Sequence, residues 1–194
     1  MNRRLAGGLV VLIVVLLSGC ALSPQSVPIR PVISAPSSLA SGQPLIIEVI
    51  DNRARDDFGA RGGIYQTAVI RPLNNVATAV QQALAVQLAQ AGFQPVDAGR
   101  SGSGDAPRLQ IGIQTIDYRL IATGVAQTVE VTVALQASAE QRGRQTHGIY
   151  RATNSQQSVN FLTAEQNERL LNQTLSQALQ QLLQDRTLLS VLTG

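Results

Sequence analysis

An alternation of apolar and polar side chains in the central part of the chain limits most strongly what it can fold into. Apolar residues occupy every second position over 109–113 and, one position out of phase, over 116–120; the same period returns over 129–137. A period of two places these side chains on one face of a strand, and a phase change of one residue is typical of a β-bulge. The sequence therefore predicts a long antiparallel hairpin with one wet face and a bulge near Gln114 and Thr115.

Other segments carry shorter signals. Residues 45–50 form a nearly continuous apolar run, which is typical of a strand covered on both faces. Weaker strands are predicted at 93–96 and 147–155, and the polar, glycine-rich residues 51–63 are predicted to form a loop.

Two segments repeat their apolar residues at helical spacing. The first covers residues 73–91 and is predicted to end at Gly92 in a left-handed conformation. The second begins at a capping box of Thr163 and Gln166 and is predicted to extend to about residue 189. Its outer face carries Asn and Gln more than charge, so this face is either solvated or a protein interface.

These elements predict a single α+β domain over residues 45–194. The expected order is β-α-β-β-β-α, a two-layer fold in which two long helices pack on one face of a mainly antiparallel four-stranded sheet.

The N-terminus has the features of a secretory signal. Two arginines precede an apolar stretch over residues 5–17, which is too short to span a bilayer comfortably. The following residues, Leu17-Ser18-Gly19-Cys20, resemble the lipobox of bacterial lipoproteins. The sequence thus predicts a signal peptide over 1–19 and a lipid anchor on Cys20. An ordinary signal peptide with a chance cysteine and an N-terminal membrane helix are the alternatives.

Residues 20–44 are predicted to be the lipidated cysteine and a tether rich in proline and serine, spanning about 27 Å as a flexible chain. The alternative is an edge strand near Val32 and Ile33, docked on the sheet. Ala21, rather than an aspartate, follows the cysteine, which favours an outer-membrane location facing the periplasm.

Charge and composition exclude several classes of function. Of the 15 basic residues, Arg3 and Arg4 lie in the signal peptide, which leaves 13 against 12 acidic residues, so we expect no nucleic-acid partner. His147 is the only histidine, which excludes a metal site built of imidazoles, and we expect no cofactor. With the single cysteine consumed by lipid, no disulfide is expected.

The lipobox, the strand leading into Val49-Ile50-Asp51-x-Arg53, and the segment Gln90-Ala91-Gly92-Phe93 resemble the YajG-like family of uncharacterised bacterial lipoproteins. The hairpin over 109–139 and the terminal Leu182-Leu183-x-Asp185-x-x-Leu188 are similar as well. The resemblance implies an envelope lipoprotein with an α/β layered domain and carries no active-site residues.

Charged residues after the first strand form the candidate ligand or partner loop: Asp51, Arg53, Arg55 and Arg61. Arginine can grip a carboxylate or phosphate with two hydrogen bonds; the alternative is a set of ion pairs that neutralise each other. The sequence favours a non-enzymatic lipoprotein that binds an envelope protein or assembles with copies of itself. A binding module for a small cell-wall or lipid-derived ligand is the second hypothesis, and an enzyme using Asp51 or Asp117 is the third.

Overall fold

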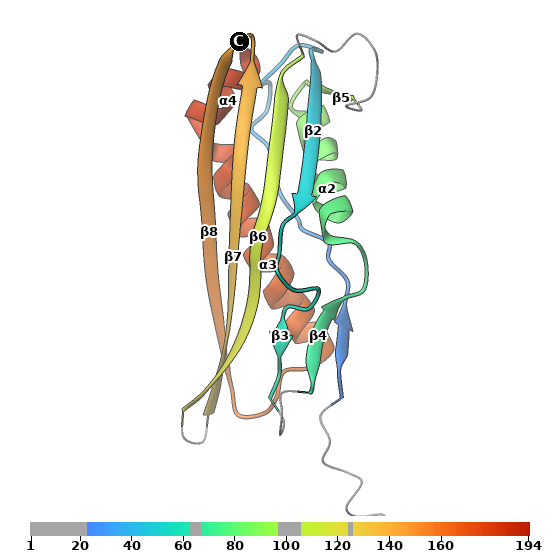
Figure 1. Ribbon diagram of the computed structural model, residues 1–194, viewed down its shortest axis with the longest axis vertical. Coiled ribbons are helices and arrows are strands. Elements are labelled where there is room, and N and C mark those ends of the chain that lie inside the picture. Colours follow the sequence, from blue (N-terminus) through green and yellow to red (C-terminus); the bar gives the residue numbers. More distant parts are fainter. Residues whose placement is uncertain (1–22, 63–66, 97–105, 124–125) are drawn as a thin grey trace, which may run out of the picture.

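The computed structural model describes residues 23–62, 67–96, 106–123 and 126–194, which form one mixed sheet and three helices (Figure 1). The strands are β1 (Gln25–Val27), β2 (Pro44–Asp51), β3 (Gly59–Ala60), β4 (Val69–Pro72), β5 (Gln94–Val96), β6 (Arg108–Thr123), β7 (Ala126–Gln141) and β8 (Arg144–Ser158). The helices are α2 (Val76–Gln90), α3 (Ala164–Gln184) and α4 (Arg186–Thr193).

The hairpin predicted from the alternating residues is the β6–β7 pair, which is antiparallel along its whole length. Its register shifts between Ile113 and Thr115, so the predicted bulge near Gln114 is confirmed. On the other side of β7, β8 continues the antiparallel pairing.

The remaining edge of β6 has two partners in succession. β2 lies parallel to its first half, and β3 pairs with its second half at Tyr118. Between them the chain leaves the sheet after Asp51 and returns at Gly59, at the level of the β6 bulge. Residues 52–58 therefore bridge a break in the pairing along this edge.

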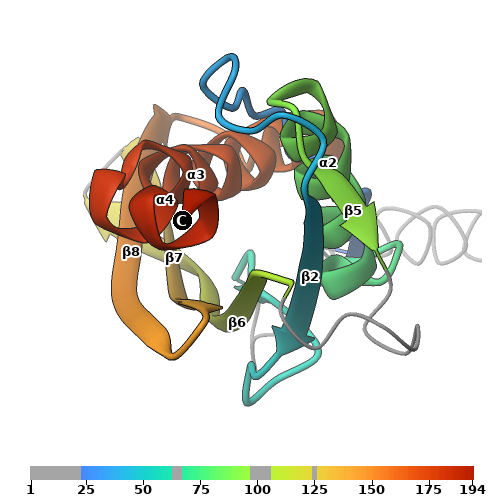
Figure 2. The same cartoon turned by 90° about the horizontal axis from the view of Figure 1, so that it is seen from above.

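The predicted sheet of four mainly antiparallel strands is wrong. The described sheet has eight strands, and four of their pairings are parallel: β1–β4, β2–β5, β2–β6 and β3–β6. Strands β1, β3 and β4 are only 3, 2 and 4 residues long, too short to carry a periodic signal. The sheet curls into a half-barrel whose open side is closed by the helices (Figure 2).

The helix starts and ends follow the sequence signals closely. The capping box of Thr163 and Gln166 is present, and Gly92 has the predicted left-handed conformation, with φ of 98°. The second predicted helix, however, is two helices. Asp185 lies between them and caps α4, because its Oδ1 accepts from the N–H groups of Thr187 and Leu188 at 2.8 and 3.2 Å.

Fully buried aliphatic side chains fill the space between sheet and helices. Leu84 of α2, Ile111 of β6 and Leu179 of α3 all have 0% of their surface exposed. None of the described helices is long and apolar enough to cross a membrane.

The predicted tether is folded from Ser23 onward, so the folded domain does not begin at residue 45. β1 pairs with β4 at the edge of the sheet, and Val27, Ile29 and Ile33 are buried in the core. Residues 28–35, which we name the N-terminal strap, then run along α3. The edge strand is thus β1, whereas Val32 and Ile33 belong to the strap.

Three side chains of α3 at a spacing of four residues hold the strap. The bonds are Arg30 N–H to Asn172 Oδ1 (2.6 Å), Val32 N–H to Ser176 Oγ (2.9 Å) and Ser34 N–H to Gln180 Oε1 (3.0 Å). A spacing of four places the three side chains on one helix face, and every second N–H of an extended chain points the same way. Part of the polar outer face of α3 is therefore used inside the molecule.

Candidate functional site

The break in pairing beside β6 gathers most of the predicted loop residues. Arg53 donates to Asp51 through Nε and Nη2, both at 2.8 Å. The Arg53 side chain is only 7% exposed, and its guanidinium lies 5.1 Å from the centre of the Phe58 ring. The two-point ion pair and the ring contact fix Arg53 in place, so its charge is already neutralised within the protein.

The neighbouring charges are paired in the same manner. Arg55 reaches Asp117 at 3.2 Å and Asp57 at 3.7 Å, and Arg119 Nε donates to the second oxygen of Asp117 at 2.5 Å. The Arg55 and Arg119 side chains are largely exposed, so these pairs add little stability. The arrangement corresponds to the interpretation of the loop as mutually neutralised ion pairs.

Arg61 lies apart from this cluster. It is 7% exposed and donates to two backbone carbonyls, that of Ser23 at 3.2 Å and that of Leu162 at 3.0 Å. Tyr118 lies nearby, and burial raises the pKa of its hydroxyl to about 12 despite the opposing charge of Arg61. Arg61 therefore joins the start of the described chain to the segment before α3, apart from the other residues of the predicted loop.

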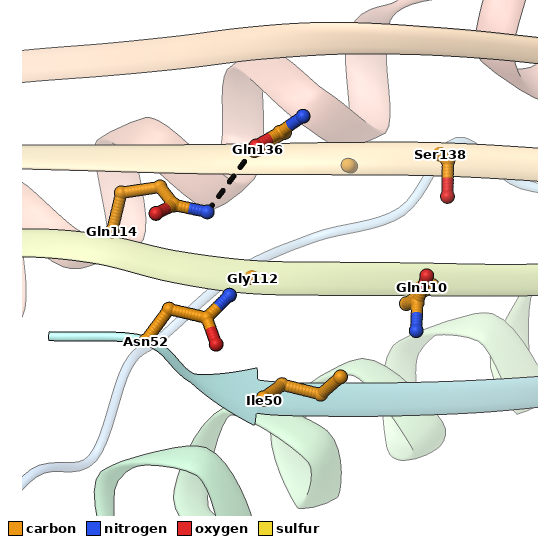
Figure 3. A pocket seen from close by; sticks show the side chains of 8 residues that line it. Ile50, Asn52, Gln110, Gly112, Gln114, Gln136 and Ser138 are labelled. Carbon is orange, nitrogen blue, oxygen red and sulfur yellow. Dashed lines mark hydrogen bonds between the residues drawn. The ribbon is translucent and has the colours of Figure 1, made fainter.

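A shallow hollow of about 280 Å³ adjoins the charged cluster on the outer face of the sheet (Figure 3). Amide side chains from three elements surround it: Asn52 after β2, Gln110 and Gln114 on β6, and Gln136 on β7. Gly112 forms its floor, because a Cβ there would lie 2.7 Å from the Asn52 amide nitrogen. Gln114 donates to Gln136 at 3.2 Å across the rim. Such a surface offers uncharged hydrogen-bond donors and acceptors.

A second groove, of about 490 Å³, runs between α2 and the strap. We name it the α2 groove; its apolar lining comes from Ile29, Pro31, Val32, Ile33, Ala79, Ala83 and Val86. Val32 and Val86 both line it and are 83% and 55% exposed, so apolar surface from the strap and from α2 meets in one groove. The 15 residues of α2 include no charged side chain. Interface cores are similarly depleted of charge.

The remaining sequence candidates are placed as follows. His147 lies exposed on β8, opposite Ser138 of β7. Within the described ranges, no three His, Cys, Asp or Glu side chains come together in a way that could hold a metal ion. Leu17, Ser18, Gly19 and Cys20 lie outside the described residues.

Sequence reasoning missed the α2 groove and the amide hollow. The α2 groove needs the strap to form one wall, and residues 28–35 were assigned to the tether. The absence of charge over residues 76–90 was a visible signal for one of its walls. No local sequence pattern indicates the amide hollow, because its side chains come from strands that are far apart in the chain.

Residues 31–193 match the model of a family described as uncharacterised lipoproteins. The chain belongs to this lipoprotein family. Membership implies association with the cell envelope through a membrane anchor. No curated protein has a sequence that matches the chain.

Solved structures resemble this chain to different degrees, all at low sequence identity. Protein XCC0632 from Xanthomonas campestris, of the DUF330 family, has a TM-score of 0.54 at 14% identity, over 87% of this lipoprotein and 94% of that chain. A putative neuraminyllactose-binding hemagglutinin homologue from Helicobacter pylori has a TM-score of 0.45 at 8% identity, over 82% and 91%. Lipoprotein GNA1162 from Neisseria meningitidis has 0.36 at 14%, over 73% and 97%.

Proposed function

We propose that this protein is a non-enzymatic bacterial lipoprotein, anchored by lipid on Cys20, whose domain binds a polypeptide through the α2 groove. In finer detail, we propose that the protein is YajG-like. We also propose that a signal peptidase recognises Leu17, Ser18 and Gly19 and cleaves the chain after residue 19. The proposal also includes an outer-membrane location facing the periplasm and no nucleic-acid partner.

The α2 groove carries the interaction part of this proposal. It combines two strongly exposed valines with a helix that lacks charge, and its volume is about 490 Å³. Exposed apolar groups that cluster on one face are typical of an interaction site. Arg30 is the one charged side chain among the lining residues of the groove, and the α2 wall carries none. The partner is either an envelope protein or a second copy of this chain, because a groove with so little charge suits both.

The charged cluster supports a role other than catalysis. Asp51 and Asp117, the carboxylates considered for an enzyme, each hold an arginine at short distance. A general base must be available to take a proton from a substrate, and these carboxylates are already engaged.

A small cell-wall or lipid-derived ligand in the amide hollow is the second candidate. The observation that favours it is the missing side chain at Gly112, which keeps the hollow open between Asn52 and Gln114. A ligand that copurifies with the native protein, and is lost in Gly112→Val, would support this candidate over the first.

The anchor is tested by Cys20→Ala. Without the thiol, lipid attachment and the cleavage that follows it fail, so we expect an uncleaved precursor by intact-mass analysis. A cleaved, soluble Cys20→Ala protein would contradict the lipid anchor.

The interaction is tested by photo-crosslinking in living cells from a reactive residue at position 86. Position 149 is the matched control, because Ile149 is similarly exposed, at 64%, but lies on the outer face of β8. We expect a discrete adduct from position 86 alone, lost when Ala83→Arg fills the groove with a long charged side chain. An adduct of twice the mass identifies a second copy, and a heavier or lighter one identifies another protein. Equal adducts from both positions would overturn the role of the groove.

A further inference from the structure

The described chain begins at one end of the molecule, where Arg61 fixes it. The Ser23 carbonyl accepts from Arg61, and the same guanidinium binds the carbonyl of Leu162, in the connection between β8 and α3. In Figure 1 the start of β1, the tips of β6 and β7 and this connection all lie at the lower end. The fold therefore places Ser23, the first described residue, at this end of the molecule.

Exposed apolar side chains lie on the elements at the same end. Ile121 near the tip of β6 is 43% exposed, and Val159 and Phe161 between β8 and α3 are 68% and 38% exposed. Phe161 lies beside Arg61, since a Cβ on the adjacent Gly62 would be 3.4 Å from its ring and 3.3 Å from Leu120. We name Ile121, Val159 and Phe161 the end patch.

The length of chain between the anchor and the fold is short. Only Ala21 and Leu22 separate Cys20 from Ser23. Consecutive Cα atoms are about 3.8 Å apart, so these three steps keep the Cα atoms of Cys20 and Ser23 within about 11 Å in any conformation. The headgroup layer of one leaflet is itself about 5–8 Å thick. A lipid on Cys20 therefore holds Ser23, and the end patch beside it, against the headgroups.

We propose that the end patch is a membrane-contact surface, inserted into the interfacial layer of the bilayer that holds the Cys20 lipid. This inference rests on the proposed anchor. Aromatic and aliphatic side chains favour the interfacial layer. The nearest exposed cation on β6, Arg119, is already paired with Asp117, so the contact depends on apolar insertion and does not require anionic lipids.

Insertion of this end sets the orientation of the domain. Its long axis stands away from the membrane, with α4 at the far end (Figure 1). The α2 groove then faces sideways, where a protein beside it in the same membrane can reach it.

The single cysteine makes the test direct. In the lipidated protein the Cys20 thiol is consumed, so Val159→Cys or Phe161→Cys provides the sole free thiol for an environment-sensitive fluorophore. Ile149→Cys, on the outer face of β8 away from this end, is the matched control. Each labelled protein is reconstituted into vesicles of zwitterionic phosphatidylcholine, with a quencher either on the lipid chains or, as iodide, in the water.

We expect the labels at 159 and 161 to be quenched at least threefold more by the lipid-borne quencher than the label at 149, and to be shielded from iodide. Equal quenching at all three positions would overturn the contact. Shielding from iodide without lipid quenching would also overturn it, and would indicate that a protein covers the patch. Flotation of the same samples separates the two proposals: protein that does not float contradicts the anchor, whereas floating protein with unquenched labels contradicts only the end patch.

Discussion

At Gly92 the backbones of two segments meet without room for a side chain. Its φ is +98°, and a Cβ would lie 2.0 Å from the Ala40 carbonyl oxygen. Left-handed backbone costs other residues about 1–2 kcal/mol, and here the clash adds to that cost. We therefore expect Gly92→Ala to lower the free energy of unfolding by about 3 kcal/mol or more, measured by urea denaturation.

Gly143, in the turn between β7 and β8, separates the cost of a left-handed backbone from the cost of the clash with Ala40. Its φ is +76°, but nothing lies within 4 Å of an added Cβ. Gly143→Ala should cost only the backbone term of about 1–2 kcal/mol. Equal losses in the two variants would show that the contact with Ala40 does not restrict position 92.

Tyr150 and Asp185 form the second residue-scale feature, a hydrogen bond of 2.7 Å between β8 and the α3–α4 junction. This bond from Tyr150 is the main cause that lowers the pKa of Asp185 from its ordinary value of 3.8; the N–H groups of Leu188 and Thr187 also lower it, while burial opposes them. Burial, and then Asp185, raise the pKa of Tyr150. Asp185 thus orients a tyrosine and caps a helix at once.

The depressed pKa of Asp185 gives a testable pH dependence. The stability that it contributes is present above pH 3.8 and is lost as the pH falls through its lower folded-state pKa. Tyr150→Phe removes the bond, so we expect it to cost about 1.5 kcal/mol at pH 6 and clearly less at pH 3. Urea titrations of both proteins at the two pH values measure this difference. An equal cost at both would contradict a loss of this contribution by pH 3.

At the scale of elements, the strap and α3 form a unit that needs specific polar side chains. Asn172 accepts from the Arg30 N–H and donates to the Pro28 carbonyl at 2.9 Å. Asn172→Ala should therefore lower the free energy of unfolding by about 1–3 kcal/mol, as expected for two lost hydrogen bonds. Gln181→Ala, at an exposed position of the same helix, should change it by less than about 0.5 kcal/mol. Similar effects of the two substitutions would contradict the strap contacts.

Helices and strands whose apolar residues repeat over several periods could be predicted from the sequence. Elements that form only because distant segments pair with them could not. The β6–β7 hairpin and its bulge follow from side-chain alternation alone. β3 has two residues and is a strand only because Tyr118 and Ile70 lie beside it. A local pattern cannot specify such a strand, since its pairing depends on the rest of the sheet.

The same limit applies to the strap. Asn172, Ser176 and Gln180 have the pattern of a solvated helix face, and proline-rich residues have the composition of a linker. The hydrogen bonds between the two segments can be recognised only once the strap is placed along α3 as an extended chain. Of the candidate loop, Asp51, Arg53 and Arg55 could be grouped from their proximity in sequence. The buried position of Arg61 could not, because its carbonyl partners lie 38 and 101 residues away.

At the scale of the whole molecule, the folded unit includes residues that look like a linker. Removing residues 1–44 would delete β1 and the strap, and would uncover the sites occupied by Val27, Ile29 and Ile33. Burying side chains of this kind contributes about 1.5–3 kcal/mol each, so the loss approaches the total stability of about 5–15 kcal/mol of a typical domain.

We therefore expect a chain that starts at Leu45 to aggregate or to lack a cooperative thermal transition. A chain that starts at Ser23 retains every contact described here, and should unfold in a single transition as a soluble protein. Size-exclusion chromatography with thermal denaturation compares the two forms. If the shorter form melted at the same temperature as the longer one, the strap would be an appendage; a lower melting temperature would show that the strap is part of the folded domain.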